Sequence, residues 1–131
     1  MTPNINQTIQ ESQWSMIKQI SQEYEEGFKI LNSLPDLSVT FYGGARIKKE
    51  SKAYQLTYGT AAEFAKKGWG VISGGGPGVM AASLAGAKDN NGVTCAFRIR
   101  LGNEKPVVVA DYDIEFLHFS TRKYMLRQSD I

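Results

Sequence analysis

The stretch VISGGGPGVMAASLAGA, at positions 71–87, sets a short apolar run against three consecutive glycines and then opens a segment rich in small residues. The apolar run predicts a buried strand, and the alanine-rich segment predicts a helix whose first turn lies near Pro77. Between them the chain turns through glycines that let another group approach the backbone closely. These glycines are Gly74, Gly75, Gly76 and Gly78.

Strands and helices alternate on both sides of this stretch. Apolar, β-branched runs between turn residues predict strands, and alanine-rich or amphipathic segments predict helices. The predicted strands are 37–41, 69–73, 93–99 and 106–112, and the predicted helices are 51–67 and the segment from Pro77 to the Asn91-Gly92 pair. Units of about thirty residues in this order predict right-handed βαβ crossovers and a mostly parallel sheet. The expected fold class is therefore α/β, a Rossmann-like three-layer sandwich.

A long amphipathic helix is predicted ahead of the sheet, from about Thr8 to Leu34, because apolar residues recur there every three or four positions. The apolar set is Ile17, Ile20, Tyr24, Phe28 and Leu31, whereas Glu11, Lys18, Glu23 and Glu26 fall largely on other faces. Gly27 lowers the helix propensity of this segment. We expect residues 1–36 to form an N-terminal helical extension and residues 37–131 to form the N-terminal portion of a Rossmann-like α/β domain.

Composition excludes several classes of function. With 131 residues, 42% hydrophobic and 21% charged, the chain fits one soluble globular domain. A net charge of +2 does not indicate nucleic acid or an acidic membrane as partner. The polar N-terminus has no secretory apolar region and no apolar run reaches membrane-spanning length, so we expect a cytoplasmic protein. A single cysteine, Cys95, and a single histidine, His118, give no basis for a metal site.

Two loops are expected at the same edge of the sheet, because both follow the carboxyl end of a parallel strand. The loop YGGAR contains Gly43 and Arg46, and the loop SGGGPG leads into a helix whose N-terminus could hold an anion. A guanidinium at Arg46, or a cation from Arg122 and Lys123 further on, could bind a phosphate or carboxylate there. The alternatives are a turn that only packs a helix on a strand, and arginines that are merely solvated. The dinucleotide pattern G-x-G-x-x-G is not matched, so NAD is not predicted.

Three motifs in this order and spacing, FYGGAR, YQLTYGTAAEFAKKGWGVISGGGPGVMAASLAGA and FSTRKYML, resemble the LOG (Lonely guy) family of cytokinin riboside 5′-monophosphate phosphoribohydrolases, also labelled lysine decarboxylase-like. The resemblance implies hydrolysis of the N-glycosidic bond of adenine-type nucleoside 5′-monophosphates, including AMP, by a dimer or larger homo-oligomer without a cofactor. It implies Arg122 as the active-site arginine with Lys123 beside it. It also implies that the nucleotide site is lined by Gly74, Gly75, Gly76, Gly78 and Met80.

One family signature is not found in this sequence. P-G-G-x-G-T-x-x-E, which carries the catalytic glutamate, normally follows the Arg-Lys helix by one strand, and we expect this chain to end before it and to be inactive alone. The terminal SDI resembles a turn into a further strand, so we expect a bare sheet edge that a partner chain or further chain covers. A non-catalytic nucleotide- or cofactor-binding carrier of the same fold is the alternative function. Pyridoxal-phosphate chemistry is excluded because no residue is marked as its Schiff-base lysine.

Overall fold

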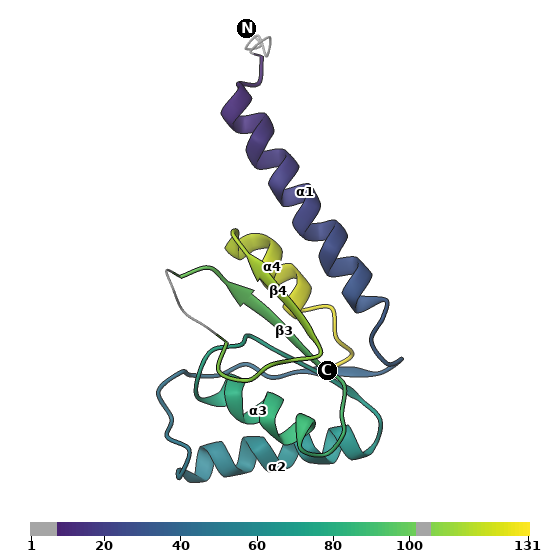
Figure 1. The fold of residues 1–131 in the computed structure, drawn as a ribbon, viewed down its shortest axis with the longest axis vertical. Coiled ribbons are helices and arrows are strands. Elements are labelled where there is room, and N and C mark those ends of the chain that lie inside the picture. Colours follow the sequence, from purple (N-terminus) through teal and green to yellow (C-terminus); the bar gives the residue numbers. More distant parts are fainter. Residues whose placement is uncertain (1–7, 102–105) are drawn as a thin grey trace, which may run out of the picture.

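The computed structural model describes residues 8–101 and 106–131, and this part of the chain forms a four-stranded parallel sheet with helices on both faces (Figure 1). The strands lie in chain order, β1-β2-β3-β4. The elements are α1 (Glu11–Leu31), β1 (Ser38–Thr40), α2 (Lys52–Lys66), β2 (Gly70–Ser73), α3 (Val79–Lys88), β3 (Thr94–Ile99), β4 (Tyr112–Phe116) and α4 (Phe119–Leu126). The Rossmann-like α/β fold with a long helix ahead of it is confirmed.

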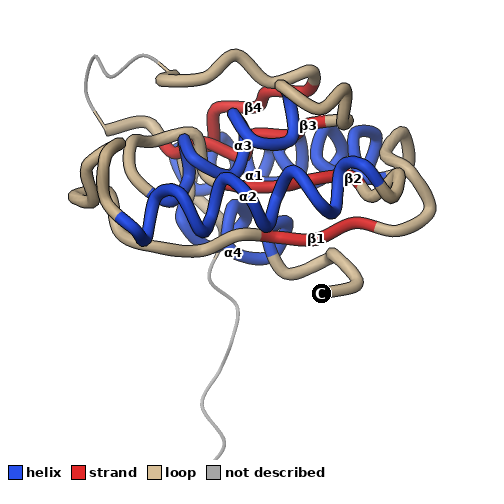
Figure 2. Tube along the Cα trace, turned by 90° about the horizontal axis from the view of Figure 1, so that it is seen from below, coloured by secondary structure: helices blue, strands red, loops and turns tan. Residues whose placement is uncertain are grey.

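The sheet separates two apolar layers, because successive side chains of a strand point to opposite faces. Figure 2 shows α2 and α3 on one side of the strands and α1 and α4 on the other. In β2, Val71 packs with alanines of α2 and α3, whereas Ile72 packs toward α4 with Phe97 and Met125. The first layer is therefore rich in alanine at its buried centre, with aromatic residues packed around it, and the second is built mainly from large side chains.

The fourth strand lies further along the chain than predicted. Residues 106–112 are rich in valine, which favours a strand, yet β4 is Tyr112–Phe116, and Val107 and Val109 are exposed. Pairing with β3 explains why the strand lies at Tyr112–Phe116 and not earlier. In this segment Ile114 and Phe116 are buried and alternate with more polar residues. Its start is fixed by Asp111, whose carboxylate accepts hydrogen bonds from the backbone N–H of Thr94 at 2.8 Å and from its hydroxyl at 3.0 Å. Long-range pairing thus overrides local propensity here.

The outer edge of β1 is not bare. The N–H of Thr40 donates to the carbonyl of Ile131 at 2.9 Å, and the N–H of Ile131 lies 3.4 Å from the carbonyl of Ser38. The carboxylate of Asp130 accepts the Ser38 N–H at 2.8 Å. This alternation is that of a parallel ladder, so the last residues pair with β1 as the predicted turn into a further strand requires. At β1 the last residues of the chain therefore cover part of the edge that was expected to be bare.

Helix α1 packs on the body through its C-terminal half, and its N-terminal half runs away from the sheet (Figure 1). The apolar side chains of the projecting half, including Trp14 and Ile17, are exposed. Glu23, which helical periodicity places on a polar face, is instead buried, at 7% exposure. Its carboxylate has partners at the start of α4, which the sequence period of α1 alone does not reveal. In the described part of the chain, no helix combines the length and apolar character that a membrane span needs.

Candidate functional site

A cavity of about 650 Å³ opens at the carboxyl-terminal edge of the sheet. Its walls are the loop after β1, the loop after β2, the end of β3 and α4, so the two loops expected to share a crevice do so. They also touch directly, since the N–H of Val79 donates to the carbonyl of Gly44 at 3.1 Å. The predicted site residues that line the cavity are Gly43, Gly74, Gly75, Gly76, Met80 and Arg122.

Three predicted site residues lie outside the cavity lining. Gly78 is the N-cap of α3, with a φ of 75°, and a Cβ added to it would overlap the carbonyl oxygen of Gly44. Its missing side chain therefore serves to pack one loop against the other. Arg46 and Lys123 are exposed and do not line the cavity, which leaves Arg122 as the basic residue that both the motif and the cavity select.

The side chains missing from the triple glycine make room for the protein itself. A Cβ on Gly74 would lie 2.5 Å from Arg122 Nη2 and would also meet the sulfur of Met80. A Cβ on Gly75 would overlap the Arg98 side chain, and the φ of 115° at Gly75 is in any case one that other residues rarely adopt. The three glycines line the cavity, and their missing side chains also leave room for side chains of the protein itself. Their absence brings two guanidinium-bearing side chains against the loop.

The backbone amides of Gly74, Gly75 and Gly76 are a second feature of this loop, which lines the cavity. Within the described residues, no protein group accepts a hydrogen bond from the N–H of Gly74, Gly75 or Gly76. If β2 continued into this loop, its amides would donate to the carbonyls of Phe41 and Phe97 on the neighbouring segments. Side chains donate to these carbonyls instead: the Ser73 hydroxyl to Phe41 at 2.9 Å, and Arg122 Nε to Phe97 at 2.7 Å. Amides released from the sheet in this way are donors for an anion at the mouth of the cavity.

Arg122 comes from the first turn of α4 and reaches back to the sheet. Its Nε donates to the Phe97 carbonyl, and burial lowers the pKa of the guanidinium below its usual value without removing its charge at neutral pH. Among residues 8–101 and 106–131, no carboxylate forms an ion pair with it. A half-buried cation whose partner is an uncharged carbonyl keeps its other N–H donors available to an anion.

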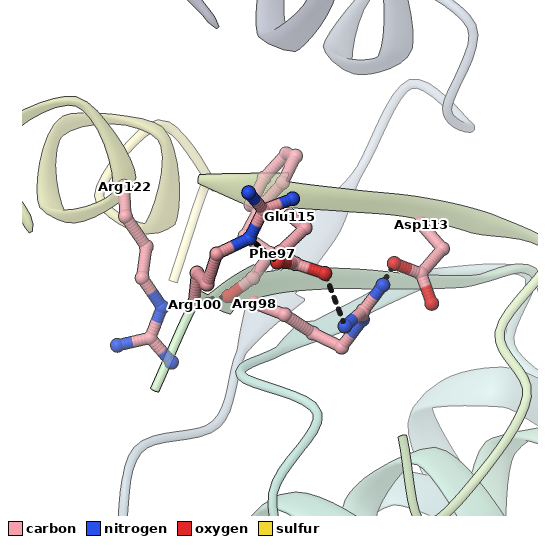
Figure 3. A network of polar contacts seen from close by, with 6 residues as sticks. All are labelled: Phe97, Arg98, Arg100, Asp113, Glu115 and Arg122. Carbon is pink, nitrogen blue, oxygen red and sulfur yellow. Dashed lines mark hydrogen bonds and ion pairs between the residues drawn. The ribbon is translucent and has the colours of Figure 1, made fainter. Parts of the chain in front are cut away.

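A second arginine in the same wall is already neutralised. Arg98 Nε lies 2.7 Å from Asp113 Oδ1, and its Nη1 lies 3.4 Å from Glu115 Oε2. Arg100 also pairs with Glu115, and this hydrogen bond is the main reason that the pKa of Glu115 is lowered. Figure 3 shows this network beside Arg122, whose guanidinium points away from the two carboxylates. The positive charge of the cavity wall is therefore concentrated at Arg122.

Apolar and aromatic side chains form the rest of the lining, among them Phe41, Tyr42 and Phe119. The Tyr42 hydroxyl donates to the carbonyl of Leu126 at 2.8 Å. Burial raises the pKa of this phenol, and the nearby charges of Arg127 and Arg122 partly offset the rise. A flat apolar group could lie along these rings while an anion attached to it meets Arg122.

Sequence reasoning missed Arg98, Tyr42 and Phe119 as lining residues. Their position in the chain offered a signal, because Tyr42 directly follows β1 and Arg98 lies near the carboxyl end of β3, where ligands of parallel sheets bind. No carboxylate is present in the lining within the described part, and no cluster of three His, Cys, Asp or Glu residues that could hold a metal occurs there. The cavity is thus equipped for binding an anion with an attached planar group.

Fold and cavity together define a Rossmann-like α/β protein with a cavity at the carboxyl-terminal edge of its sheet. The family model that matches the chain is that of the SLOG cluster4 family, over residues 36–123. The chain belongs to the SLOG cluster4 family, which confirms its LOG-like character and indicates a nucleotide-related function.

The fold is also found among solved structures. The X-ray structure of TM1055, a target of the Northeast Structural Genomics Consortium, superposes with a TM-score of 0.57 at 23% sequence identity. The match covers 72% of this chain and 56% of TM1055, so the chain spans a little over half the length of that protein. At this identity the similarity concerns the fold alone. No curated protein matches the chain.

Proposed function

We propose that the chain binds a nucleoside 5′-monophosphate of the adenine type, with the phosphate on Arg122. The observation that carries this proposal is the half-buried Arg122 guanidinium, which lies against Gly74 and, in the described part of the chain, has a carbonyl but no carboxylate as partner. A phosphate there would accept charge-assisted hydrogen bonds from the guanidinium and from the loop amides.

The remainder of the cavity supports a nucleoside as the group attached to the phosphate. Its volume of about 650 Å³ lies in the range of small-molecule sites, about 300–1,000 Å³. The aromatic side chains Phe41, Tyr42 and Phe119 offer surfaces on which a purine ring can stack, with gains of about 1–3 kcal/mol per base in comparable contacts. Because Arg98 is neutralised by two carboxylates, the site offers one strong anion position, which suits a monophosphate.

Calorimetric titration of the chain with AMP, adenosine, ribose 5-phosphate and adenine tests this proposal. AMP is expected to bind most tightly and ribose 5-phosphate more weakly, and adenosine and adenine are expected to bind weakest because they lack the anion. The dissociation constant of AMP is expected to rise with salt, as phosphate binding requires. Equal affinity for AMP and adenosine would exclude Arg122 as a phosphate site.

Hydrolysis of the N-glycosidic bond is the second candidate, and membership of a LOG-like family, whose matched residues 36–123 include the glycine loop and Arg122, favours it. In this reaction water adds its hydroxyl to C1′ of the ribose, the C1′–N bond breaks, and a proton passes to the leaving base. Stabilising the oxocarbenium-like transition state ordinarily needs a carboxylate, and the described lining contains none. We therefore propose that the lining residues described here bind the nucleotide. Hydrolysis would require a carboxylate from outside this lining to enter the site.

Release of adenine from AMP, followed by chromatography, separates the two candidates. Binding without adenine release supports a nucleotide-binding role for this chain. Adenine release that is lost in Arg122→Gln supports hydrolysis, and it would show that a group outside the described lining performs the work of the carboxylate.

A further inference from the structure

The buried carboxylate of Glu23 joins α1 to the start of α4. Its Oε2 accepts the backbone N–H of Leu117 at 2.8 Å, and its Oε1 accepts the hydroxyl of Thr121. His118 Nδ1 lies 3.3 Å from Oε2. Leu117 directly precedes the N-cap of α4, His118 is that N-cap, and Thr121 lies in the first turn of the helix. Glu23 lies more than 90 residues before them in the chain, at separations of 94, 95 and 98.

This contact supplies what the first turn of α4 lacks. The N-cap residue of α4, His118, makes no side-chain cap hydrogen bond of its own. A carboxylate at a helix N-terminus pairs with the positive end of the helix dipole and with N–H groups that have no partner in the helix. Glu23 therefore places a negative charge from another helix at this end of α4, and its burial is explained by its hydrogen bonds to Leu117 and Thr121.

A second contact holds α1 on α4 one helical turn further along. A Cβ added to Gly27 would lie 2.5 Å from the sulfur of Met125, so only glycine allows the two helices to approach this closely. Glu23 and Gly27 are four residues apart and face the same neighbour. Their contacts, Thr121 and Met125, lie on either side of Arg122 in the sequence.

We infer that Glu23 is a positioning residue for the Arg122 guanidinium. Thr121 immediately precedes Arg122, so fixing the first turn of α4 fixes the point from which the arginine side chain starts. At the other end, the 2.7 Å hydrogen bond from Nε to the Phe97 carbonyl forms only when α4 is seated correctly on the sheet. Helix α1 lies outside the residues that the family model matches, yet it controls the geometry of the anion site.

The effect on AMP binding rests on the proposed function, so the test includes a readout that needs no ligand. The full chain is compared with Glu23→Gln, which keeps the size of the side chain and removes its charge, and with Thr121→Val, which removes the hydroxyl from the α4 side. The control is Glu26→Gln, the same chemical change at an exposed position of α1. Hydrogen exchange of the Arg122 Nε–H, observed by NMR, reports on the hydrogen bond to Phe97.

Both Glu23→Gln and Thr121→Val are expected to speed hydrogen exchange at the Arg122 Nε–H. Glu23→Gln is also expected to weaken AMP binding about tenfold. Glu26→Gln is expected to change neither. In an Arg122→Gln background, Glu23→Gln is expected to leave AMP affinity unchanged, because its effect passes through the arginine. If the Glu23 carboxylate only stabilised the fold, Glu23→Gln would lower the free energy of unfolding. It would not speed exchange at the Arg122 Nε–H, and its effect on AMP affinity would not depend on Arg122.

The possible results separate the two proposals. Unchanged exchange at the Arg122 Nε–H in both variants overturns the positioning role, whatever the affinity for AMP. Should Glu23→Gln not fold, Thr121→Val alone decides. If the wild-type chain does not bind AMP at all, the proposed function fails, and faster exchange in the variants still supports Glu23 as the residue that positions Arg122.

Discussion

Two arginines contact the same glycine loop, and only one of them is paired with carboxylates. Arg98, from β3, packs on Gly75 and lies between the carboxylates of Asp113 and Glu115. Arg122, from α4, packs on Gly74 and has the carbonyl of Phe97 as its hydrogen-bond partner. Both line the cavity, so position relative to the cavity does not distinguish them.

The partners of a charged side chain therefore decide what it can bind. An arginine between two carboxylates has no net positive field to offer an anion, and a ligand phosphate near it would meet their negative charges as well. An arginine held by a neutral carbonyl is oriented without being neutralised. We therefore assign the structural role to Arg98 and the binding role to Arg122, and the following predictions test that division.

The largest effect is expected from Arg122→Gln. Loss of the charge-assisted hydrogen bonds to phosphate is expected to weaken AMP binding about 100-fold, measured by calorimetry. Arg127→Gln is the matched control, because Arg127 ends the same helix, is exposed and does not line the cavity. Equal losses in the two variants would mean that only the overall positive charge matters, and the division between the arginines would then be wrong.

A smaller loss of AMP affinity is expected from Gly74→Ala, which keeps Arg122 but fills the space that its guanidinium occupies. In Gly74→Ala the new Cβ meets the ends of the Arg122 and Met80 side chains, which are flexible enough to move, so the fold is expected to survive. Displacement of the guanidinium is expected to weaken AMP binding about tenfold. Gly44→Ala, in the neighbouring loop, is the control, since an added Cβ there meets nothing within 4 Å. Unchanged affinity in Gly74→Ala would show that the guanidinium position is not critical.

Arg98→Gln is expected to affect the stability of the fold more than AMP binding. AMP affinity is expected to stay within about threefold of wild type, because the lost charge was already neutralised. The midpoint of urea unfolding is expected to fall, since the two like-charged carboxylates lose the cation between them. Calorimetry and urea unfolding on the same sample measure both. A loss of affinity as large as that of Arg122→Gln would place the phosphate on Arg98 instead.

The features that could be predicted from the sequence depend on local patterns. Alternating apolar runs and alanine-rich helices gave the parallel sheet, and the rule that loops at the carboxyl ends of strands meet brought Gly43 and Gly74 together. Arg122 could be selected because it lies in a recognisable motif on the helix after β4. Each of these inferences needs only the order of elements along the chain.

The remaining features depend on pairings between distant segments. Asp113 and Glu115 can be recognised as partners of Arg98 only after β4 is placed at Tyr112–Phe116, because that register sets Arg98 opposite Glu115. The local valine run places the strand too early and hides this pairing. Glu23 was missed for a similar reason, since helical periodicity assigns a carboxylate to the solvent unless the helix packed against it is known.

The smallest expected effect is a pH dependence within the Arg98 network. The hydrogen bond from Arg100, together with the charge of Arg98, holds the pKa of Glu115 below its usual value of 4.5. A carboxylate with a lowered pKa in the folded state stabilises that state above pH 4.5, and the contribution is lost as the pH falls through the lowered value. Urea unfolding is therefore expected to separate wild type from Glu115→Gln near neutral pH and to bring the two together in acid. A difference between them that grew in acid would mean that Glu115 is not stabilised as an anion by these arginines, and the neutralisation of Arg98 would have to come from Asp113 alone.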